Sequence, residues 1–267
     1  MSGGEALARC ASEKLGYPLM GREILVEAAS KLGVAEATLR KKFESSPGMW
    51  DRLTSNRRLY IIAVQAALAE HAADGNLVYH GHAGHLLLRG IPGVLRVRLI
   101  APLAMRVRTL MERQQMNQEA ATDYIRKVDV DRVRWTKFIY GMDWSDPSLY
   151  DLVINLEKMS LETACGLLCE SVSRPEFTAS PELGKAVADF RLGCRVKVAL
   201  AANVETRNID FEIHARDGVV EISAEMPTAG VLTSGSARAD AAVAHIAEGV
   251  PGVQKTVLNL RKIDAYH

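Results

Sequence analysis

The sequence predicts an α/β first part, with helices on both faces of a parallel sheet, followed by a small α+β domain. Up to about residue 170, short apolar runs alternate with helical segments of ten or more residues, the pattern of parallel strands joined by helices. Hydroxyl residues and two prolines interrupt helical periodicity at 171–182. Beyond them, two alternating segments meet at Asp217-Gly218, which is typical of a hairpin. We therefore expect domains at 1–170 and 183–267, joined by a linker.

Composition narrows the class of protein. The chain has 267 residues, enough for two domains, and 33 basic against 32 acidic side chains, so no charge excess favours a nucleic-acid partner or a polybasic membrane anchor. Four cysteines are too sparse for a disulfide framework, which favours a reducing, cytoplasmic location. No apolar run approaches the ~20 residues of a membrane helix, and the first residues do not resemble a signal peptide.

In the first part, each expected element has a local signal at one of its ends. A helix at 4–15 ends before Gly16, a strand at 94–101 is closed by Pro102 in the first turn of the next helix, and Ser160 is a good N-cap for the last helix. The other expected helices are 22–32, 35–44, 54–73, 103–113 and 117–138, and the other expected strands are 77–80 and 152–155.

The second part alternates differently. A helix at 183–202 precedes strands at 209–215 and 219–224, and a helix at 236–249 precedes a last strand at 254–260. This order of helix, strand, strand, helix and strand predicts a small α+β sandwich.

The first residues suggest a phosphate site. Ser2, Gly3 and Gly4 run directly into a helix, and glycines let backbone N–H groups at a helix start approach phosphate oxygens. A complete phosphate-binding loop also needs a lysine and a hydroxyl residue after the last glycine, where this chain has Glu5 and Ala6. A flexible chain start is the alternative interpretation.

A basic helix carries the second candidate site. Asp129 and Arg132 are three residues apart and share a helix face, and Arg126 lies about one turn before them. Arginines suit phosphoryl transfer because they neutralise charge on phosphate oxygens. A solvated, ion-paired helix is the alternative, since exposed ion pairs are common.

Histidines and cysteines offer weaker candidates. His80, His82 and His85 could bind zinc, but no cysteine or acidic residue beside them completes a site, and we expect no stoichiometric metal. Cys165 and Cys169 are one helical turn apart without a second pair, so we expect buried packing residues.

Together, several segments resemble the cytidylate kinase-like branch of the P-loop nucleoside monophosphate kinases. The segments are 2–4, 13–18, 77–89, 91–94, 96–102, Asp129-x-x-Arg132 and 140–155. The resemblance implies a P-loop kinase-like parallel sheet and ATP- and Mg²⁺-dependent phosphorylation of CMP or dCMP. By this resemblance, donor phosphates would be bound by Ser2, Gly3 and Gly4. Phosphoryl transfer would involve Arg106, Arg126, Asp129 and Arg132, and the acceptor would be bound by Arg22 and His82.

The chain departs from this family pattern at three places. Gly21 and His82 stand where the pattern has aspartate and arginine, and no segment before Ser2 supplies the first strand and the front of the glycine loop. A catalytically degenerate nucleotide sensor or regulator is therefore the alternative to a kinase.

Residues 183–263 resemble a BON domain. The resemblance rests on 195–200, on the hairpin at Asp217-Gly218-Val219-Val220, and on 250–253 before the last strand. It implies a module that binds a protein or a membrane surface. The sequence leaves the oligomeric state open.

Overall fold

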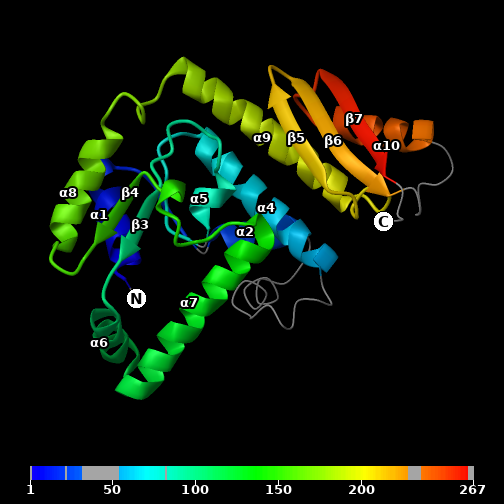
Figure 1. The fold of residues 1–267 in the computed structure, drawn as a ribbon. Helices are drawn as coiled ribbons and strands as arrows, with labels where there is room; N and C mark the ends of the chain where they lie inside the picture. The colour runs from blue at the N-terminus through cyan, green and yellow to red at the C-terminus, as the bar shows by residue number, and fades with distance from the viewer. Residues whose placement is uncertain (1, 22, 32–53, 82, 228–235, 264–267) are drawn as a thin grey trace. The chain divides into compact units, whose positions relative to one another are not determined.

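The computed structural model describes residues 2–21, 23–31, 54–81, 83–227 and 236–263, and the chain forms two compact units (Figure 1). Described residues up to 23 and from 76 to 179 form the first unit, and those at 24–31, 54–75 and 180–263 form the second. The expected helix at 35–44 lies outside the described residues. No helix in the described part of the chain is long and apolar enough to cross a membrane.

The first unit alternates helices and short strands as the sequence predicts. Its elements are α1 (Gly4–Leu15), β1 (Leu19–Met20), β2 (Val78–Tyr79), α5 (Gly84–Leu87), β3 (Val97–Ile100), α6 (Leu103–Gln114), α7 (Gln118–Tyr140), η2 (Pro147–Leu149), β4 (Leu152–Asn155) and α8 (Leu161–Val172). The local signals hold. Gly16 ends α1 with φ 68°, and the Ser160 hydroxyl accepts the Thr163 N–H at the start of α8.

The strands pair in parallel, but not as one sheet. β1 pairs with β2, and β3 pairs with β4 with Val97 opposite Leu152. Within the described residues no strand joins the two pairs, so the expectation of a single parallel sheet was wrong for this part of the chain. The described strands are two to four residues long: β2 and β3 are shorter than the apolar runs that predict them, β4 matches its run at 152–155, and β1 was not predicted.

Several apolar clusters hold the described part of the first unit together, and two of them join the helices that carry the candidate site. One joins α1, β3, β4 and α8, which lie together in Figure 1; its buried members are Leu7, Ile154, Leu156, Ala164 and Cys165. The other joins α6 to α7 through Val107, Leu110, Ala121 and Ile125.

The first cluster also contains a disulfide. Cys10 of α1 and Cys165 of α8 are bonded across 155 residues of sequence. The expectation that Cys165 is a packing cysteine was therefore wrong: the packing of α1 on α8 brings together two sulfurs that lie in different parts of the sequence. Cys169 and Cys194 are free.

The second unit is built on a three-stranded sheet. Its elements are α2 (Glu23–Lys31, in this unit from Ile24), α4 (Thr54–Ala73), α9 (Pro181–Ala202), β5 (Phe211–Arg216), β6 (Val219–Pro227), α10 (Ser236–Glu248) and β7 (Lys255–Ile263). β5 and β6 are antiparallel, and β6 and β7 are parallel. Asp217 and Gly218 both have positive φ, 52° and 78°, as a tight two-residue hairpin turn requires.

Helices α9 and α10 pack against each other and against this sheet. Val196, Leu200, Val220, Ile222 and Val243 are fully buried between them. Helix α4 lies within the range 1–170 expected for the first domain, yet it packs along α9 in the second unit. Its Glu70 carboxylate accepts hydrogen bonds from Arg195 Nε and Nη2 at 2.6 and 2.7 Å.

Candidate functional site

The start of α1 is a close-fitting glycine turn. Gly3, the N-cap residue, has φ 82°, and no side chain caps the helix. A Cβ on Gly3 would lie 3.2 Å from Leu156 Cδ1, just beyond β4, and 3.4 Å from Leu161 Cδ1 at the start of α8. Only glycine suits both the positive φ and this contact. The open amide end of α1, which begins at Gly4 as the sequence predicts, is suited to bind an anion.

His80 approaches the same turn from the end of β2. A Cβ on Gly4 would lie 2.9 Å from His80 Nε2, so the imidazole packs directly over this glycine. The His80 N–H donates to the Met20 carbonyl at 2.9 Å, which continues the pairing of β2 with β1. The sequence singled out His80 only as a metal ligand, and the structure places it beside the phosphate-binding candidate.

Glu5 follows in the first turn of α1. Its exposed carboxylate lies 3.7 Å from Arg9 Nη2 and 3.8 Å from Arg113 Nη1 of α6. Arg106 lies seven residues before Arg113, nearly two helical turns, so both arginines lie on one face of α6. The contact of Arg113 with Glu5 brings the end of α6 close to the start of α1.

Arg106, Asp129 and Arg132 meet between α6 and α7. Arg106 Nη1 and Nη2 each donate to one oxygen of Asp129 at 2.7 Å, a bidentate pair. Burial lowers the pKa of the Arg132 guanidinium; the Asp129 charge opposes this and Arg106 reinforces it. Arg106 Nε is buried, with no hydrogen-bond partner in the described part of the chain. One carboxylate thus binds the Arg106 guanidinium directly and lies near the Arg132 guanidinium, and the cluster keeps a net positive charge.

The structure brings together only part of the predicted site. Arg106 joins Asp129 and Arg132, although Arg106 lies on another helix. Arg126 is exposed and forms no ion pair with the residues that the structure describes. Arg22 and His82 lie outside the described residues. Among the described residues, no group of three His, Cys, Asp or Glu side chains could hold a metal ion.

A second cluster, which residue-by-residue reasoning did not identify, lies where α5 meets the loop before β4. The His85 ring stands edge-on to Trp144 at 5.0 Å and packs on Tyr150 at 4.7 Å between centroids. Arg98 lies over the Tyr150 ring and donates to the Ser145 carbonyl. The sequence signals for this cluster were the segments 77–89, 96–102 and 140–155, quoted as part of a resemblance, and His85 was considered there only as a metal ligand.

This aromatic cluster keeps His85 neutral. Burial, followed by the charges of Arg96 and Arg98, lowers the pKa of His85 to about 4. Arg96 itself is fixed by Asp151, whose carboxylate accepts from Arg96 Nη2 at 2.7 Å and from Nε at 3.1 Å. Arg98 of β3 therefore anchors the loop that precedes β4, and we assign the aromatic cluster a structural role.

Residues 1–158 match the sequence profile of the Cytidylate kinase-like family. The chain belongs to this family. The match spans α1 and its glycine turn, the Arg106–Asp129–Arg132 cluster and the aromatic cluster, and it ends before α8. The family assignment supports a nucleotide kinase-like function.

Individual members of the family are distant. The chain is 30% identical over 114 residues to a cytidylate kinase of Staphylothermus marinus, covering 42% of this chain and 63% of that enzyme. It is 28% identical over 161 residues to a cytidylate kinase of Methanosarcina acetivorans, covering 59% and 83%. A solved structure of an uncharacterized protein from Eubacterium ventriosum aligns with TM-score 0.49 and 18% identity, over 65% of this chain and 93% of that one.

Family membership implies ATP and Mg²⁺, and the first unit offers groups for both ends of a triphosphate. The amide end of α1 suits donor phosphates. The buried Arg106 Nε, which has no hydrogen-bond partner among the described residues, and the Arg132 guanidinium suit a phosphoryl group. Mg²⁺ in phosphoryl-transfer sites is bound largely by substrate phosphates and water, so a dedicated acidic cluster is not required.

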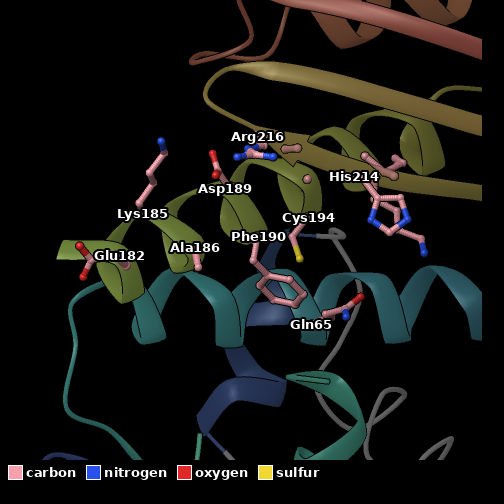
Figure 2. Close-up of a pocket in the computed structure, with 13 residues that line it drawn as sticks. Gln65, Glu182, Lys185, Ala186, Asp189, Phe190, Cys194, His214 and Arg216 are labelled. Atoms are coloured by element: carbon pink, nitrogen blue, oxygen red, sulfur yellow. The ribbon is translucent and has the colours of Figure 1, made fainter. Parts of the chain in front are cut away.

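A separate groove lies in the second unit, between α4, α9 and β5 (Figure 2). The volume of the groove is about 480 Å³. Phe190 and Cys194 point from α9 toward α4, whereas Lys185 and Asp189 point away from α4. Burial raises the pKa of the Cys194 thiol to about 12, which keeps it protonated and unreactive. Of the predicted site residues that the structure describes, none lines this groove.

Proposed function

We propose that the chain is an ATP-dependent nucleoside monophosphate kinase that phosphorylates CMP or dCMP. The observation that carries this proposal is the cluster of Arg106, Asp129 and Arg132 within the family-matched region, in which Asp129 is hydrogen-bonded to Arg106 and lies near enough to Arg132 to affect its pKa. An excess of fixed positive charge is what a transferring phosphoryl group needs.

Each group has a distinct part in this scheme. The amide end of α1 binds the donor phosphates, and a bound Mg²⁺ would supply charge neutralisation there. Arg132 contacts the phosphoryl group in transfer. Because Arg132 is largely buried, its positive charge stabilises that group more strongly than an exposed arginine would. Asp129 holds Arg106 by two hydrogen bonds and so fixes its orientation, at little entropic cost during the reaction.

A phosphotransfer assay tests the proposal. The full chain with ATP and Mg²⁺ is offered CMP, dCMP, UMP and AMP, and diphosphate product is measured. We expect turnover with CMP or dCMP, and a loss of at least ~100-fold in kcat for Arg132→Ala. Arg134→Ala, an exposed arginine two residues further along α7, is the matched control and should retain full activity. Absence of turnover with every acceptor, in protein shown to be folded, would contradict the proposal.

One observation favours a second candidate, a nucleotide-binding regulator without turnover. Glu5 places a carboxylate in the first turn of α1, where β- and γ-phosphates would be repelled. A regulator would bind nucleotide by calorimetry and give no product. In that case Glu5→Lys should strengthen ATP binding several-fold, whereas Glu13→Lys, near the other end of α1, should change it little.

For the C-terminal part, we propose a BON-like module at 183–267 that binds a partner. Its order of α9, β5, β6, α10 and β7 supports this assignment. Co-sedimentation of the full chain with anionic phospholipid vesicles tests for a membrane-surface partner. Binding that salt abolishes would favour a lipid surface, and no binding would leave a protein partner as the proposal.

A further inference from the structure

Three of the four cysteines gather where α1 packs on α8. Cys10 and Cys165 form the disulfide, and Cys169, one turn after Cys165, packs against the same apolar cluster as Cys10. A disulfide in a compartment that keeps thiols reduced is usually transient, catalytic or redox-sensing. The position of this bond shows what its opening would affect.

The bond lies on the helix that begins with the glycine turn. Gly4 is six residues before Cys10, about 9 Å along α1. At the other end of the contact, Leu161 begins α8 and its side chain lies against Gly3. The same two helices are thus joined covalently at Cys10, through an apolar cluster that includes Leu7 and Ala164, and by packing at Gly3. A change at the disulfide would reach Gly3 along α1, which is one continuous helix.

The two bonded sulfurs differ in access. The Cys165 residue is fully buried, at 0% exposure, whereas Cys10 is partly exposed. A thiol from solution therefore reaches the bond from the Cys10 side. Cys169 is partly buried and unbonded on the same helix as Cys165, which makes it a matched control for the loss of a thiol at this interface.

We propose that the Cys10–Cys165 disulfide is a reversible redox control of the anion-binding start of α1: the bond holds Gly3 against α8, and its reduction weakens phosphate binding there. The proposal rests on the proposed function in one respect, that the start of α1 binds phosphate groups. It adds a regulatory input that the phosphotransfer scheme does not contain.

The chemistry requires a dithiol as reductant. One dithiol thiolate attacks Cys10 Sγ, the S–S bond breaks, and its electron pair leaves on Cys165 Sγ, which takes up a proton. The second dithiol sulfur then attacks the mixed disulfide and expels the Cys10 thiolate, which is also protonated. The dithiol ends as a cyclic disulfide, having supplied two electrons, and oxidation of Cys10 and Cys165 restores the bond.

The experiment compares the two redox forms of the full chain. Protein purified without reductant is alkylated in denaturant and weighed; we expect two labels, on Cys169 and Cys194, and four after dithiothreitol. Calorimetry then measures tripolyphosphate binding, and hydrogen exchange follows the amides at the start of α1. Reduction should weaken binding at least 5-fold and speed exchange, and reoxidation should restore both.

Variants separate the bond from other thiol effects. Cys165→Ser, and Cys10→Ser at the more exposed end, should behave like the reduced protein under all conditions, whereas Cys169→Ser should respond to reductant like the wild type. Four labels in the unreduced protein, or unchanged binding and exchange on reduction, would overturn the proposal.

The outcomes also separate this proposal from the proposed function. Turnover of nucleotide without any redox effect would support the kinase proposal and refute the redox control. Redox-dependent binding and exchange without turnover keep the control and remove the kinase. If neither form binds tripolyphosphate, control of phosphate binding is refuted, whatever the exchange rates show.

Discussion

Arg106 of α6 and Asp129 of α7 are joined by two hydrogen bonds of 2.7 Å, and this ion pair links the two helices. Their side chains differ in exposure, 14% for Arg106 and 43% for Asp129. The more exposed Asp129 carboxylate therefore binds the mostly buried Arg106 guanidinium. The charges of both residues affect the pKa of Arg132.

Removing that carboxylate should destabilise the first unit. In Asp129→Asn the bidentate pair is lost and Arg106 faces Arg132 without a counter-charge. Because Asp129 is partly exposed, we expect a loss of only about 1 kcal/mol in the free energy of unfolding, together with lower phosphotransfer activity. Urea unfolding measures the first quantity, and Asp123→Asn, an exposed position on α7, is the control. Equal stability of the two variants would show that the pair contributes nothing measurable.

His85 should make stability depend on pH. Its pKa is about 4 in the folded protein and near 6.5 when exposed, so the unfolded chain binds more protons between these values. Stability is therefore fully present above about pH 6.5 and is lost as the pH falls toward 4, by at most about 3 kcal/mol. His85→Phe keeps an aromatic ring and removes the titration. Urea unfolding at pH 7 and 4.5 should show a smaller acid loss in this variant; an identical loss would assign the effect to other groups.

The pair of Glu70 and Arg195 should hold α4 on α9 in the second unit. Glu70→Gln removes the charge from a carboxylate that accepts two hydrogen bonds from Arg195 and lies 3.9 Å from Arg191 Nη1. We expect a loss of about 1–2 kcal/mol in the free energy of unfolding, measured in urea. Glu205→Gln, an exposed carboxylate just after α9, should leave stability unchanged. A larger effect at Glu205 than at Glu70 would refute this assignment.

Glycine substitutions test the hairpin turn. Gly218 has φ 78°, and a Cβ there would lie 2.8 Å from Gln254 Cγ, so Gly218→Ala should lower stability by about 1–2 kcal/mol. Gly184, in α9, has open space around its Cβ position, and Gly184→Ala should raise stability by up to about 1 kcal/mol. Thermal unfolding of the two variants should shift Tm in opposite directions; shifts of the same sign would contradict the turn geometry.

Local signals predicted the individual elements well. Gly16, Pro102 and Ser160 mark helix ends in the sequence and in the structure, because caps depend on a residue's own conformation and on neighbours three or four positions away. The strands were predicted less well. β3 is four residues long where an eight-residue run was expected, since strand length depends on the partner strand as much as on the run itself.

The candidate site divides in the same way. Asp129 and Arg132 were paired from their spacing on one helix, which geometry within α7 decides. The contact of Asp129 with Arg106, the packing of His80 over Gly4 and the bond between Cys10 and Cys165 join residues 23, 76 and 155 positions apart. Spacing in the sequence carries no information about such meetings without a resemblance to guide it.

By itself, the sequence determined most of the helices and strands in their order, though neither β1 nor α5, together with the glycine turn before α1, the charged face of α7 and the Asp217-Gly218 hairpin. All of these depend on short-range backbone preferences that act within a few residues. The tertiary structure alone decided the separation of the strands into two parallel pairs within the described residues, the placement of α4 with α9, and the disulfide. These depend on which apolar faces bury one another, a competition among distant segments that no local pattern encodes.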